Sequence, residues 1–514
     1  MRPVLTRDEM RAADAAALER VSHETLVTRA GTAVAHGALR LLGGAYGRRV
    51  VVVAGKGSNG ADGRVAASVL RQRGARVLVI EAADAPGGAA LPSCDLVVDG
   101  AYGTGFRGSY DAPQVPAGAL VLAIDVPSGV DADTGAAPGA AVRADRTVTF
   151  AALKPGLLQG EGPSRSGTTE VADIGIGFPT PGALLMEDAD VAALVPPRPS
   201  GVNKWTNAVG VAAGSAGMEG SAILCTRGAM AAGAGMIRLG SPGDPIAPWP
   251  TEAVRVHLPG QGWAAAFLEA TAKCKAVVIG PGLGTGDDVA EEIRAVLVAV
   301  PVPLVIDADA LTALGDAAAA RTLLDKREAP SILTPHDGEY ARIAGSAPGE
   351  DRLDAARRLA AATGAVVLLK GPLTAVADPR GEVAVPDVLL SAAGGPSLAT
   401  AGSGDVLSGI IGALCARGLG PLEAAALGAH VHGRAGGHQP HGGRGAVSHG
   451  GHRRPGPGPP PRARPARTAT APTGRGGRRR PGPATARARR PGRARARRAR
   501  PPRGDRGRGR TARR

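Results

Sequence analysis

Continuous apolar runs that end in glycine-bearing or carboxylate-bearing turns recur along this chain. Val50–Ala54 is such a run and leads into Gly55–Gly63, and Ala276–Ile279 leads in the same way into Gly280–Gly284. Runs of this kind are typical of strands that are buried on both faces of a parallel sheet. Parallel strands need crossover connections, which are usually helical. The chain is therefore predicted to fold in the α/β class.

The strand-like runs fall into two groups, which predicts two α/β domains. The first group follows two expected helices within residues 6–42, and its later strands are Val77–Ile80, Leu96–Asp99, Leu120–Asp125 and Thr147–Phe150. The second group comprises Val209–Ala213, Ala276–Ile279, Leu304–Ile306, Ile332–Leu333 and Val366–Leu369. Residues 179–204 are rich in proline and alanine and read as a linker, so the domains are predicted at residues 1–200 and 201–436. The first is expected to be a Rossmann-like doubly wound sheet.

The net charge of +16 comes from the C-terminal segment. Residues 437–514 contain 24 Arg, no Lys and one acidic residue, whereas residues 1–436 contain 37 basic and 44 acidic residues. The predicted folded part is mildly acidic and carries no basic field for nucleic acid. The tail is rich in Arg, Pro and Gly and is expected to be disordered.

Two interpretations of this tail remain open. It is either the product of a reading-frame shift near residues 436–450, which would remove a closing helix, or a genuine arginine-rich arm that binds nucleic acid or another acidic surface. We rank the frameshift first, because the tail lacks aromatic residues and lysine.

The cysteines and the hydropathy indicate a cytoplasmic protein. Cys94, Cys225, Cys274 and Cys415 are far apart in sequence and form no Cys-x-x-Cys pair, so we expect buried free thiols. No apolar run is long enough for a membrane span and no secretory leader is recognised.

The loop after the first long strand fits the pattern G-x-G-x-x-G at Gly55, Gly57 and Gly60, with Glu81 about twenty residues further on. That pattern is typical of dinucleotide-binding folds, so an oxidoreductase is one alternative. Asp62 is expected at the start of the following helix, about Arg64–Arg73, where its charge would oppose a pyrophosphate. An N-cap role for Asp62 is the competing interpretation.

Oxygen-bearing side chains follow three of the expected strands of the first domain. Asn59, Asp99 and Ser128 would meet at the carboxyl edge of a parallel sheet. Their oxygens suit a hard monovalent cation, although Asp and Ser are also common loop residues.

Residues 4–178 resemble the NAD(P)H-hydrate epimerase family of YjeF N-terminal type. The matching motifs are Gly55–Gly63, the run from Asp99 through Gly103–Gly108, and Asp125–Gly129. The family has Asn and Gly where this chain has Ser58 and Ala61, and Ala61 would cost about 1 kcal/mol if its backbone needed positive φ. The resemblance implies that Asn59, Asp99 and Ser128 hold potassium. It also implies that Asp125 contacts the substrate and is a catalytic residue. It also implies hydrate binding by Ser58, Asn59, Gly60, Ala61, Asp62, Gly103, Thr104, Gly105, Phe106, Arg107, Gly108 and Ser109.

The second predicted domain places polar and small residues at its strand ends. Gly402–Asp405 opens a helix over about Val406–Cys415, and small residues there let phosphates approach backbone N–H groups. Asp405 would lie in the first helical turn, either as a simple cap or as a proton acceptor. Lys370 follows a buried strand directly and is expected to contact phosphate. His336 alone is expected to be only a helix-start residue.

Together these loops resemble the ADP-dependent NAD(P)H-hydrate dehydratases, a ribokinase-like family. The resemblance covers about residues 204–436 and rests on the glycine loop 214–220, Gly280–Gly284, Asp307–Leu311, Thr334–His336, Lys370-Gly371 and Gly402–Asp405. It implies Asp405 as catalytic base, hydrate contacts at Gly282, His336 and Asp405, and ADP with magnesium as cofactors. The implied nucleotide contacts are Lys370, Gly371, Pro372, Leu373, Thr374 and Gly404.

The two resemblances together indicate a bifunctional repair enzyme that epimerises hydrated NADH and NADPH and dehydrates the S form with ADP. We expect small-molecule substrates and a homo-oligomer. Two alternatives stay open at this point: a ribokinase-like vitamin kinase fused to a non-catalytic Rossmann-like module, and the NAD-dependent oxidoreductase.

Overall fold

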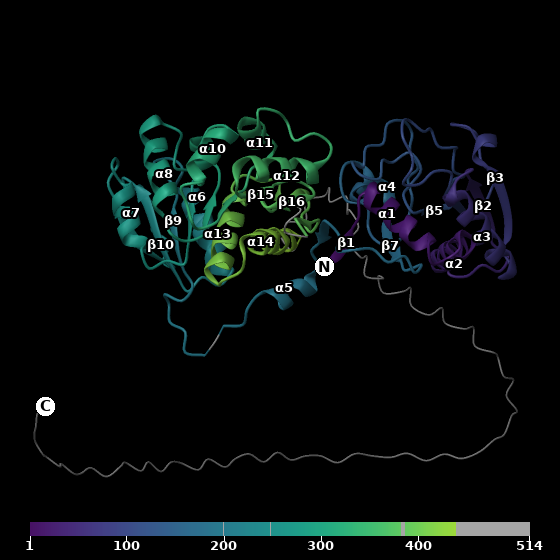
Figure 1. Ribbon diagram of the computed structural model, residues 1–514, viewed down its shortest axis with the longest axis horizontal. Helices are drawn as coiled ribbons and strands as arrows, with labels where there is room; N and C mark the ends of the chain where they lie inside the picture. Colours follow the sequence, from purple (N-terminus) through teal and green to yellow (C-terminus); the bar gives the residue numbers. More distant parts are fainter. Residues whose placement is uncertain (199, 247, 382–385, 438–514) are drawn as a thin grey trace, which may run out of the picture. The chain divides into compact units, whose positions relative to one another are not determined.

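A computed structural model describes residues 1–198, 200–246, 248–381 and 386–437. These residues form two β-sheets with their helices, and both sheets are largely parallel (Figure 1). The predicted α/β class is therefore confirmed. The expectations for the tail fall on residues 438–514, outside the described residues.

The first sheet is entirely parallel, with strand order β3-β2-β4-β5-β6-β7. Its strands are β2 (Arg49–Ala54), β3 (Arg76–Glu81), β4 (Leu96–Gly100), β5 (Leu120–Ile124), β6 (Arg146–Phe150) and β7 (Thr168–Ala172). The five strands predicted from apolar runs are confirmed, and β7 adds an edge strand that has no such run. Because β3 lies on one side of β2 and β4 on the other, the strand order reverses at β2, and ligands bind at such a point in open α/β sheets.

Helices cover one face of this sheet. They are α1 (Arg7–Leu18), α2 (His23–Leu42) and α3 (Ser58–Gln72), and they share a core with strand residues such as Val52 and Leu122. Among the described residues, the opposite face packs against non-helical segments that include Leu91 and Val142. The short elements η1 (Ala82–Asp84), η2 (Pro155–Leu157) and α4 (Gly162–Ser166) complete this part.

The start of α3 differs from the sequence prediction. The helix begins at Ser58 and not near Arg64, so the glycine loop itself forms the first helical turn. Asp62 therefore lies in the second turn and is buried, which excludes the competing interpretation of Asp62 as an N-cap. Ala61 has helical geometry and is absent from the residues with positive φ, so the expected backbone cost does not arise.

The second sheet has eleven strands in the order β1-β8-β17-β16-β15-β14-β13-β12-β9-β10-β11. The run from β15 to β11 is parallel, whereas β16 is antiparallel to both β15 and β17. The strands are β1 (Arg2–Val4), β8 (Ala183–Leu185), β9 (Ala208–Ala212), β10 (Met236–Pro242), β11 (Ala253–Leu258), β12 (Ala276–Ile279), β13 (Leu304–Ile306), β14 (Ser331–Leu333), β15 (Val366–Leu369), β16 (Thr374–Ala377) and β17 (Val388–Ser391).

The segment interpreted as a linker is partly structured. It contains β8 and α5 (Asp188–Leu194), and β8 pairs with β17 on one side and with β1 on the other. Three residues near the N-terminus thus extend the second sheet. The predicted boundary near Gly201 remains a prediction, but residues before it contribute a strand to the second sheet.

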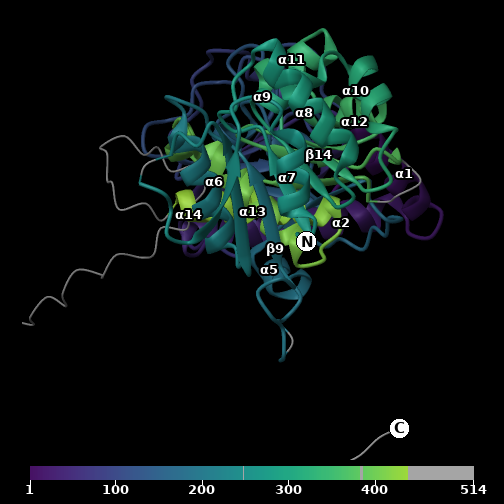
Figure 2. The ribbon, with the colours of Figure 1, turned by 90° about the vertical axis from the view of Figure 1, so that its left-hand side faces the viewer.

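Two helical layers enclose the second sheet (Figure 2). One layer packs on a core that includes Val209 and Val278, and it consists of α6 (Glu219–Ala231), α13 (Ser403–Ala416) and α14 (Pro421–Gly436). The other packs on a core that includes Val277 and Ile306, and it consists of α7 (Ala264–Thr271), α8 (Asp287–Ala299), α9 (Asp309–Leu314), α10 (Ala317–Leu324), α11 (Asp337–Ala344) and α12 (Arg352–Thr363). The short η4 (Pro396–Leu398) precedes α13.

All four cysteines are buried and unpaired, as the sequence predicted. Within the described ranges, each helix is too short or too polar to cross a bilayer.

The α6–α13 contact depends on glycine. A Cβ on Gly409 would lie 2.0 Å from the carbonyl oxygen of Cys225, and one on Gly228 would lie 2.3 Å from that of Val406. The absence of side chains at these positions lets the two helix backbones approach closely, and this approach sets the position of α13 and of Asp405 on its first turn.

We therefore expect Gly409→Ala to destabilise the protein by about 1–3 kcal/mol through overpacking. Gly220→Ala in α6 is the matched control, because its added Cβ meets nothing within 4 Å. Thermal unfolding should show a lower Tm for the first variant and an unchanged or slightly raised Tm for the second. Equal Tm values would contradict the close-packing argument.

Candidate functional site

The structure brings together the three predicted cation ligands at the carboxyl edge of the first sheet. Asp99 accepts hydrogen bonds from the Ser128 hydroxyl at 2.6 Å and from the Ser128 backbone N–H at 2.8 Å. The Asn59 amide donates to the carbonyl oxygens of Tyr102 at 3.1 Å and Ile124 at 2.7 Å. The Tyr102 backbone N–H in turn donates to the Ser128 hydroxyl at 2.9 Å, so Tyr102 links the three residues.

Asp99 is nearly inaccessible to solvent, with 2% of its surface exposed. Burial raises its pKa to about 6, although the hydrogen bonds from Ser128 act in the opposite direction. A carboxylate in this position gains from a nearby cation, because a positive charge would offset the cost of its desolvation.

Glycines allow this loop cluster to close. A Cβ on Gly60 would lie 1.9 Å from the Gly55 carbonyl oxygen, and one on Gly103 would lie 2.5 Å from the Asn59 amide. The pattern G-x-G-x-x-G therefore serves tight packing of the α3 start. Glu81 is the acid expected to contact a ribose in a dinucleotide-binding fold. Both of its carboxylate oxygens instead accept hydrogen bonds from the Arg64 guanidinium group, at 2.6 and 2.8 Å.

A cavity of about 200 Å³ lies beside this cluster on the helix-covered face. Five of the predicted residues line it: Ser58, Asn59, Asp62, Thr104 and Asp125. The rest of the 103–109 loop makes other contacts or is exposed: Arg107 faces Asp131 at 3.8 Å and the Ser109 hydroxyl donates to the Pro138 carbonyl oxygen at 3.0 Å.

Asp125 is held at the wall of this cavity by a fully buried lysine. Lys154 has no exposed surface, and its ammonium group lies 2.6 Å from Asp125 Oδ1. The Thr149 hydroxyl also donates to that oxygen, at 2.9 Å. Asp125 has a φ of 66°, in the left-handed region, which is uncommon for a residue with a side chain and is frequent at functional sites. Sequence analysis missed Lys154, although a lysine in the apolar stretch directly after a buried strand was a usable signal.

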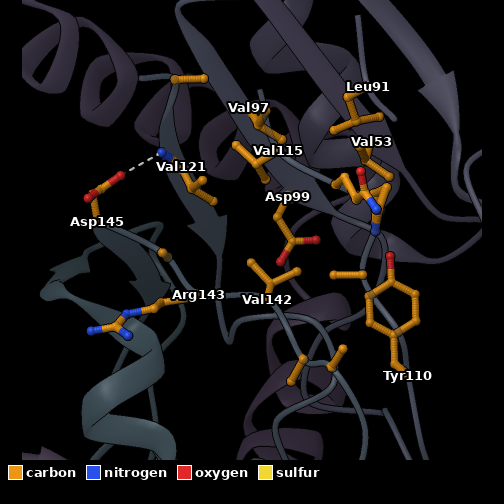
Figure 3. A pocket seen from close by; sticks show the side chains of 17 residues that line it. Val53, Leu91, Val97, Asp99, Tyr110, Val115, Val121, Val142, Arg143 and Asp145 are labelled. Carbon is orange, nitrogen blue, oxygen red and sulfur yellow. Dashed lines mark hydrogen bonds between the residues drawn. The ribbon is translucent and has the colours of Figure 1, made fainter. Parts of the chain in front are cut away.

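A larger cavity of about 480 Å³ lies on the other face of the sheet (Figure 3). Its walls are mainly aliphatic and include Val53, Leu91 and Val142. Of the predicted site residues, only Asp99 lines it. The polar chemistry of the first sheet is therefore concentrated at the smaller cavity.

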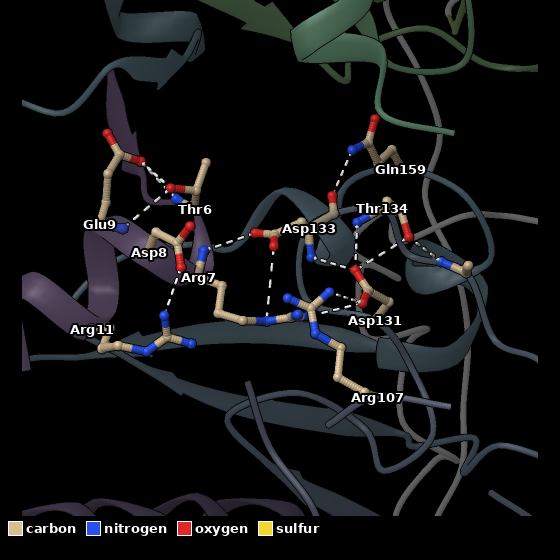
Figure 4. A network of polar contacts seen from close by, with 11 residues as sticks. Thr6, Arg7, Asp8, Glu9, Arg11, Arg107, Asp131, Asp133, Thr134 and Gln159 are labelled. Atoms are coloured by element: carbon tan, nitrogen blue, oxygen red, sulfur yellow. Dashed lines mark hydrogen bonds and ion pairs between the residues drawn. The ribbon is translucent and has the colours of Figure 1, made fainter. Parts of the chain in front are cut away.

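The loop that carries Arg107 is near a buried arginine network (Figure 4). Arg7 is 3% exposed and contacts Asp131 at 2.8 Å, and its backbone N–H donates to Asp133 at 2.7 Å. Burial opposes ionisation of Asp131, but hydrogen bonds from Thr134 and Arg7 lower its pKa overall. This network fixes the 131–134 turn, which Arg107 faces.

The second predicted site centres on Lys370 at the end of β15. Its ammonium group lies 2.9 Å from Asp307 Oδ1 and 3.5 Å from Glu339 Oε2. The Ser408 hydroxyl, from α13, donates to the other Asp307 oxygen at 2.5 Å. Burial alone would raise the pKa of Asp307, yet Lys370 and these hydrogen bonds lower it. The buried carboxylate of Asp307, which follows β13, thereby connects Lys370 with Ser408 of α13.

Asp405 lies in the first turn of α13, as predicted. Burial raises its pKa to about 6, a hydrogen bond with Ser221 lowers it, and the nearby Asp307 charge raises it. A Cβ on the neighbouring Gly404 would lie 3.6 Å from the Lys370 ammonium. A carboxylate of this kind can accept a proton near neutral pH.

The glycine loops after β9 and β12 meet beside Asp405. The Ser215 hydroxyl donates to the Gly282 carbonyl oxygen at 2.9 Å, and a Cβ on Gly282 would lie 2.9 Å from that of Ser221. Gly282 has a φ of 66°, so a side chain there would be both crowded and strained. The Gly284 N–H donates to Asp309 at 2.8 Å, which connects this turn to the start of α9.

His336 caps α11, in agreement with the helix-start position expected for this residue alone. Its Nδ1 accepts from the Gly338 and Glu339 backbone N–H groups at 3.0 and 3.3 Å. The ring is also largely exposed, so a ligand contact at Nε2 is compatible with the cap. Glu339 completes the capping box and reaches Lys370, which joins this loop to the site.

Arg352 supports the predicted nucleotide loop from below. It donates to the carbonyl oxygens of Lys370 at 2.7 Å and Leu373 at 3.3 Å, and it contacts Asp337 at 2.9 Å. Leu373 is 1% exposed, whereas Gly371 and Pro372 are exposed and accessible to a ligand. Arg352, Glu339 and Ser408 were not predicted, because no local motif marks them.

Two known protein families match the chain, each over a different part of it. Residues 209–442 match the family model described as NAD(P)H-hydrate dehydratase, and residues 23–90 and 81–156 match the one described as YjeF-related protein N-terminus. A bifunctional NAD(P)H-hydrate repair enzyme of Mycobacterium tuberculosis strain H37Rv is 41% identical over 456 residues, covering 83% of this chain and 92% of the relative. That of Escherichia coli K12 is 34% identical over 477 residues, covering 84% and 87%. Among solved structures, an ADP/ATP-dependent NAD(P)H-hydrate dehydratase from Bacillus subtilis is 31% identical, with a TM-score of 0.41, and covers 48% of this chain and 86% of its own.

The Lys370–Asp307 pair yields a stability prediction. In Lys370→Met the buried Asp307 loses its cation, so the Tm at pH 7.5 should fall by an amount equivalent to about 3 kcal/mol. The wild-type pair keeps its contribution above the unfolded pKa, because the folded-state pKa of Asp307 is lowered. Without Lys370, burial disfavours the Asp307 carboxylate, so the variant takes up a proton and regains stability as pH falls. The difference between wild type and variant, measured by calorimetry, should therefore narrow toward pH 4.

The double variant Lys370→Met/Asp307→Asn is the control. It removes both charges and should be more stable than Lys370→Met alone at pH 7.5. A double variant that is less stable than the single one would show that the unpaired carboxylate is not the cause.

Proposed function

The chain belongs to the family of bifunctional NAD(P)H-hydrate repair enzymes, and we propose that each of its two sheets carries one of the two activities. The first site would interconvert the R and S forms of hydrated NADH and NADPH. The second would dehydrate the S form with consumption of ADP. The observation that carries this assignment is the presence of one carboxylate-bearing site at the carboxyl edge of each sheet.

At the first site, the hydrated nicotinamide ring would enter the cavity between Asp125, Asp62 and Thr104. Asp125 would contact the substrate, because Lys154 and Thr149 hold its carboxylate at the cavity wall. The remaining residues of the 58–62 and 103–109 segments would contact the rest of the dinucleotide.

Potassium fits the donors beside this cavity. Asp99, Ser128 and Asn59 offer oxygen atoms, which are the ligands that hard cations prefer. The fit rests on Asp99. Within the described ranges its buried carboxylate contacts hydrogen-bond donors from Ser128 and Ala101 and no cationic side chain. A bound potassium ion would supply that positive charge and order the loops that carry the substrate contacts.

At the second site, Asp405 would act as the base. It would take the proton of the hydrate hydroxyl, whose oxygen then attacks a phosphoryl group of the nucleotide. AMP would leave in this transfer. Loss of phosphate from the resulting ester, with release of a proton from the adjacent ring carbon to solvent, would restore the double bond of the dihydronicotinamide ring. Lys370, with the backbone of Gly371–Thr374 and Gly404, would bind the nucleotide phosphates. Gly282 and His336 would contact the hydrate.

Magnesium normally accompanies phosphoryl transfer. Among the described residues, no group of three His, Cys, Asp or Glu side chains is placed to hold a metal ion. We therefore propose that magnesium enters with the nucleotide phosphates, and we assign it no protein ligands. A cytoplasmic location and a homo-oligomeric state remain predictions.

Two substitutions should separate the activities. Asp405→Asn should lower ADP-dependent dehydration of the S hydrate by about 10²–10⁴-fold, because it removes the base, and should leave epimerisation intact. Asp125→Asn should have the opposite pattern. Recovery of dihydronicotinamide absorbance measures dehydration, and chromatographic separation of the R and S forms without nucleotide measures epimerisation.

The wild-type dehydration rate should also fall as pH drops through about 6, where Asp405 becomes protonated. If Asp405→Asn dehydrates the S hydrate at the wild-type rate, the assignment of the base is wrong.

Potassium dependence tests the cation site separately. Asp99→Asn should raise the potassium concentration needed for half-maximal epimerisation by about tenfold or more, since a charged ligand is lost. Titration with potassium chloride, at ionic strength held constant with choline chloride, gives this value. An unchanged potassium response in the variant would place the ion elsewhere.

A further inference from the structure

The proposed function leaves open which groups move protons during epimerisation. The 200 Å³ cavity is lined by carboxylates from three separate segments: Asp14 on α1, Asp62 on α3 and Asp125 after β5. The other titratable groups that face it are Lys154 and His23. The surroundings of each of these three acids determine which of them can donate or accept a proton in the cavity.

Asp125 is the acid with cationic support. Lys154 contacts it at 2.6 Å, and Thr149 and the Phe150 backbone N–H also donate to the same oxygen at 2.9 and 3.3 Å. The ammonium group of Lys154 is itself bound to the Thr149 hydroxyl and the Phe150 carbonyl oxygen. This arrangement fixes the position of the Asp125 carboxyl group.

Asp62 has the opposite surroundings. Only 4% of it is exposed, and within the described part of the chain no hydrogen bond or ion pair reaches its carboxyl group. Burial raises its pKa to about 8, with further contributions from the charges of Asp125 and Asp14. At neutral pH this carboxyl group therefore holds a proton and can donate it into the cavity.

Asp14 reaches the cavity from α1. It is half-buried, and burial together with the Asp125 charge raises its pKa, while Lys154 lowers it. Asp14 thus reaches the cavity from α1, whereas Asp62 reaches it from α3.

We propose that Asp62 and Asp14 are the proton-transfer pair of the epimerase site, with Asp62 as general acid and Asp14 as general base, and that Lys154 positions Asp125. The proposal rests on the epimerase function assigned above. It assigns roles to Asp14, Asp62 and Lys154 that the resemblance to the family does not supply.

The chemistry balances without any further reactant. The hydrated ring carries its hydroxyl on the carbon bonded to the ring nitrogen. Asp62 gives its proton to that hydroxyl, the C–O bond breaks with its electron pair on oxygen, and water leaves while the nitrogen lone pair forms a C=N bond. A water molecule then adds to the opposite face of the same carbon, its proton goes to Asp14, and the electron pair returns to nitrogen. Solvent carries the proton from Asp14 back to Asp62.

The charges in the cavity favour this route. Two further carboxyl groups, Asp14 and Asp125, line the cavity with a single lysine, and proton donation by Asp62 adds a negative charge there. The ring cation formed between the two steps is therefore stabilised by carboxylates that are already in place.

The test measures epimerisation of the R hydrate by the full chain, without nucleotide, between pH 5.5 and 9.5. For wild type, kcat/KM should decline tenfold per pH unit above about pH 8, where Asp62 loses its proton. Asp62→Asn should lower the rate by about 10²–10⁴-fold and abolish this decline, and Asp14→Asn should also lower it by about 10²-fold or more. Asp8→Asn, at an exposed position of α1, is the matched control and should retain the wild-type rate.

A second measurement needs no variant. When wild type epimerises the hydrate in ¹⁸O-labelled water, each turnover should place one labelled oxygen on the ring carbon, above the uncatalysed exchange. Inverted product that keeps its original oxygen would overturn the proposal. So would an Asp62→Asn variant that retains both the rate and the decline above pH 8.

These outcomes are distinguishable from failure of the proposed function. If wild type dehydrates the S hydrate but never interconverts R and S, the epimerase assignment itself is wrong, and the proton-transfer proposal falls with it. If wild type interconverts them and the Asp62→Asn and Asp14→Asn variants do so equally well, only the proton-transfer proposal is wrong. ADP-dependent dehydration by each variant reports that the chain is folded.

Discussion

A charged group that leaves water needs a partner, and each sheet meets this requirement with a lysine–aspartate pair at its carboxyl edge. Lys154 and Asp125 form the pair in the first sheet, at 2.6 Å, and Lys370 and Asp307 form it in the second, at 2.9 Å. Removing such charges from solvent is costly, so each pair gathers additional hydroxyl partners. The loops that carry these partners are thereby held where a substrate would bind.

The two pairs leave neighbouring carboxyl groups in different states. Asp62 lies near Asp125 and Asp405 lies near Asp307, and in the described part of the chain neither Asp62 nor Asp405 forms an ion pair with a lysine. Burial and a like charge raise the pKa of both, to about 8 and about 6. Asp62 therefore holds a proton at neutral pH, whereas Asp405 can accept one.

Local patterns in the sequence were sufficient for much of the fold and of the site. Val50–Ala54 and Ala276–Ile279 are strands because continuous apolar runs are stable only where both faces are buried. Asn59, Asp99 and Ser128 could be grouped because the direction of parallel strands places their ends at one edge. The start of α3 was misplaced, since Gly55–Gly63 has the composition of a loop, and its helical geometry depends on packing of Gly60 against Gly55.

The sequence by itself determined the α/β class, the central parallel strands of both sheets, and the family to which both halves belong. Only the tertiary structure decided that β1 and β8 join the second sheet, that Arg352 supports the loop at Lys370, and that Asp14 faces the same cavity as Asp62. The physical reason is the range of the interactions. Hydrophobic periodicity and turn chemistry act over a few residues and can be read locally, whereas desolvation and charge pairing depend on residues that are distant in sequence and become neighbours only when the chain has folded.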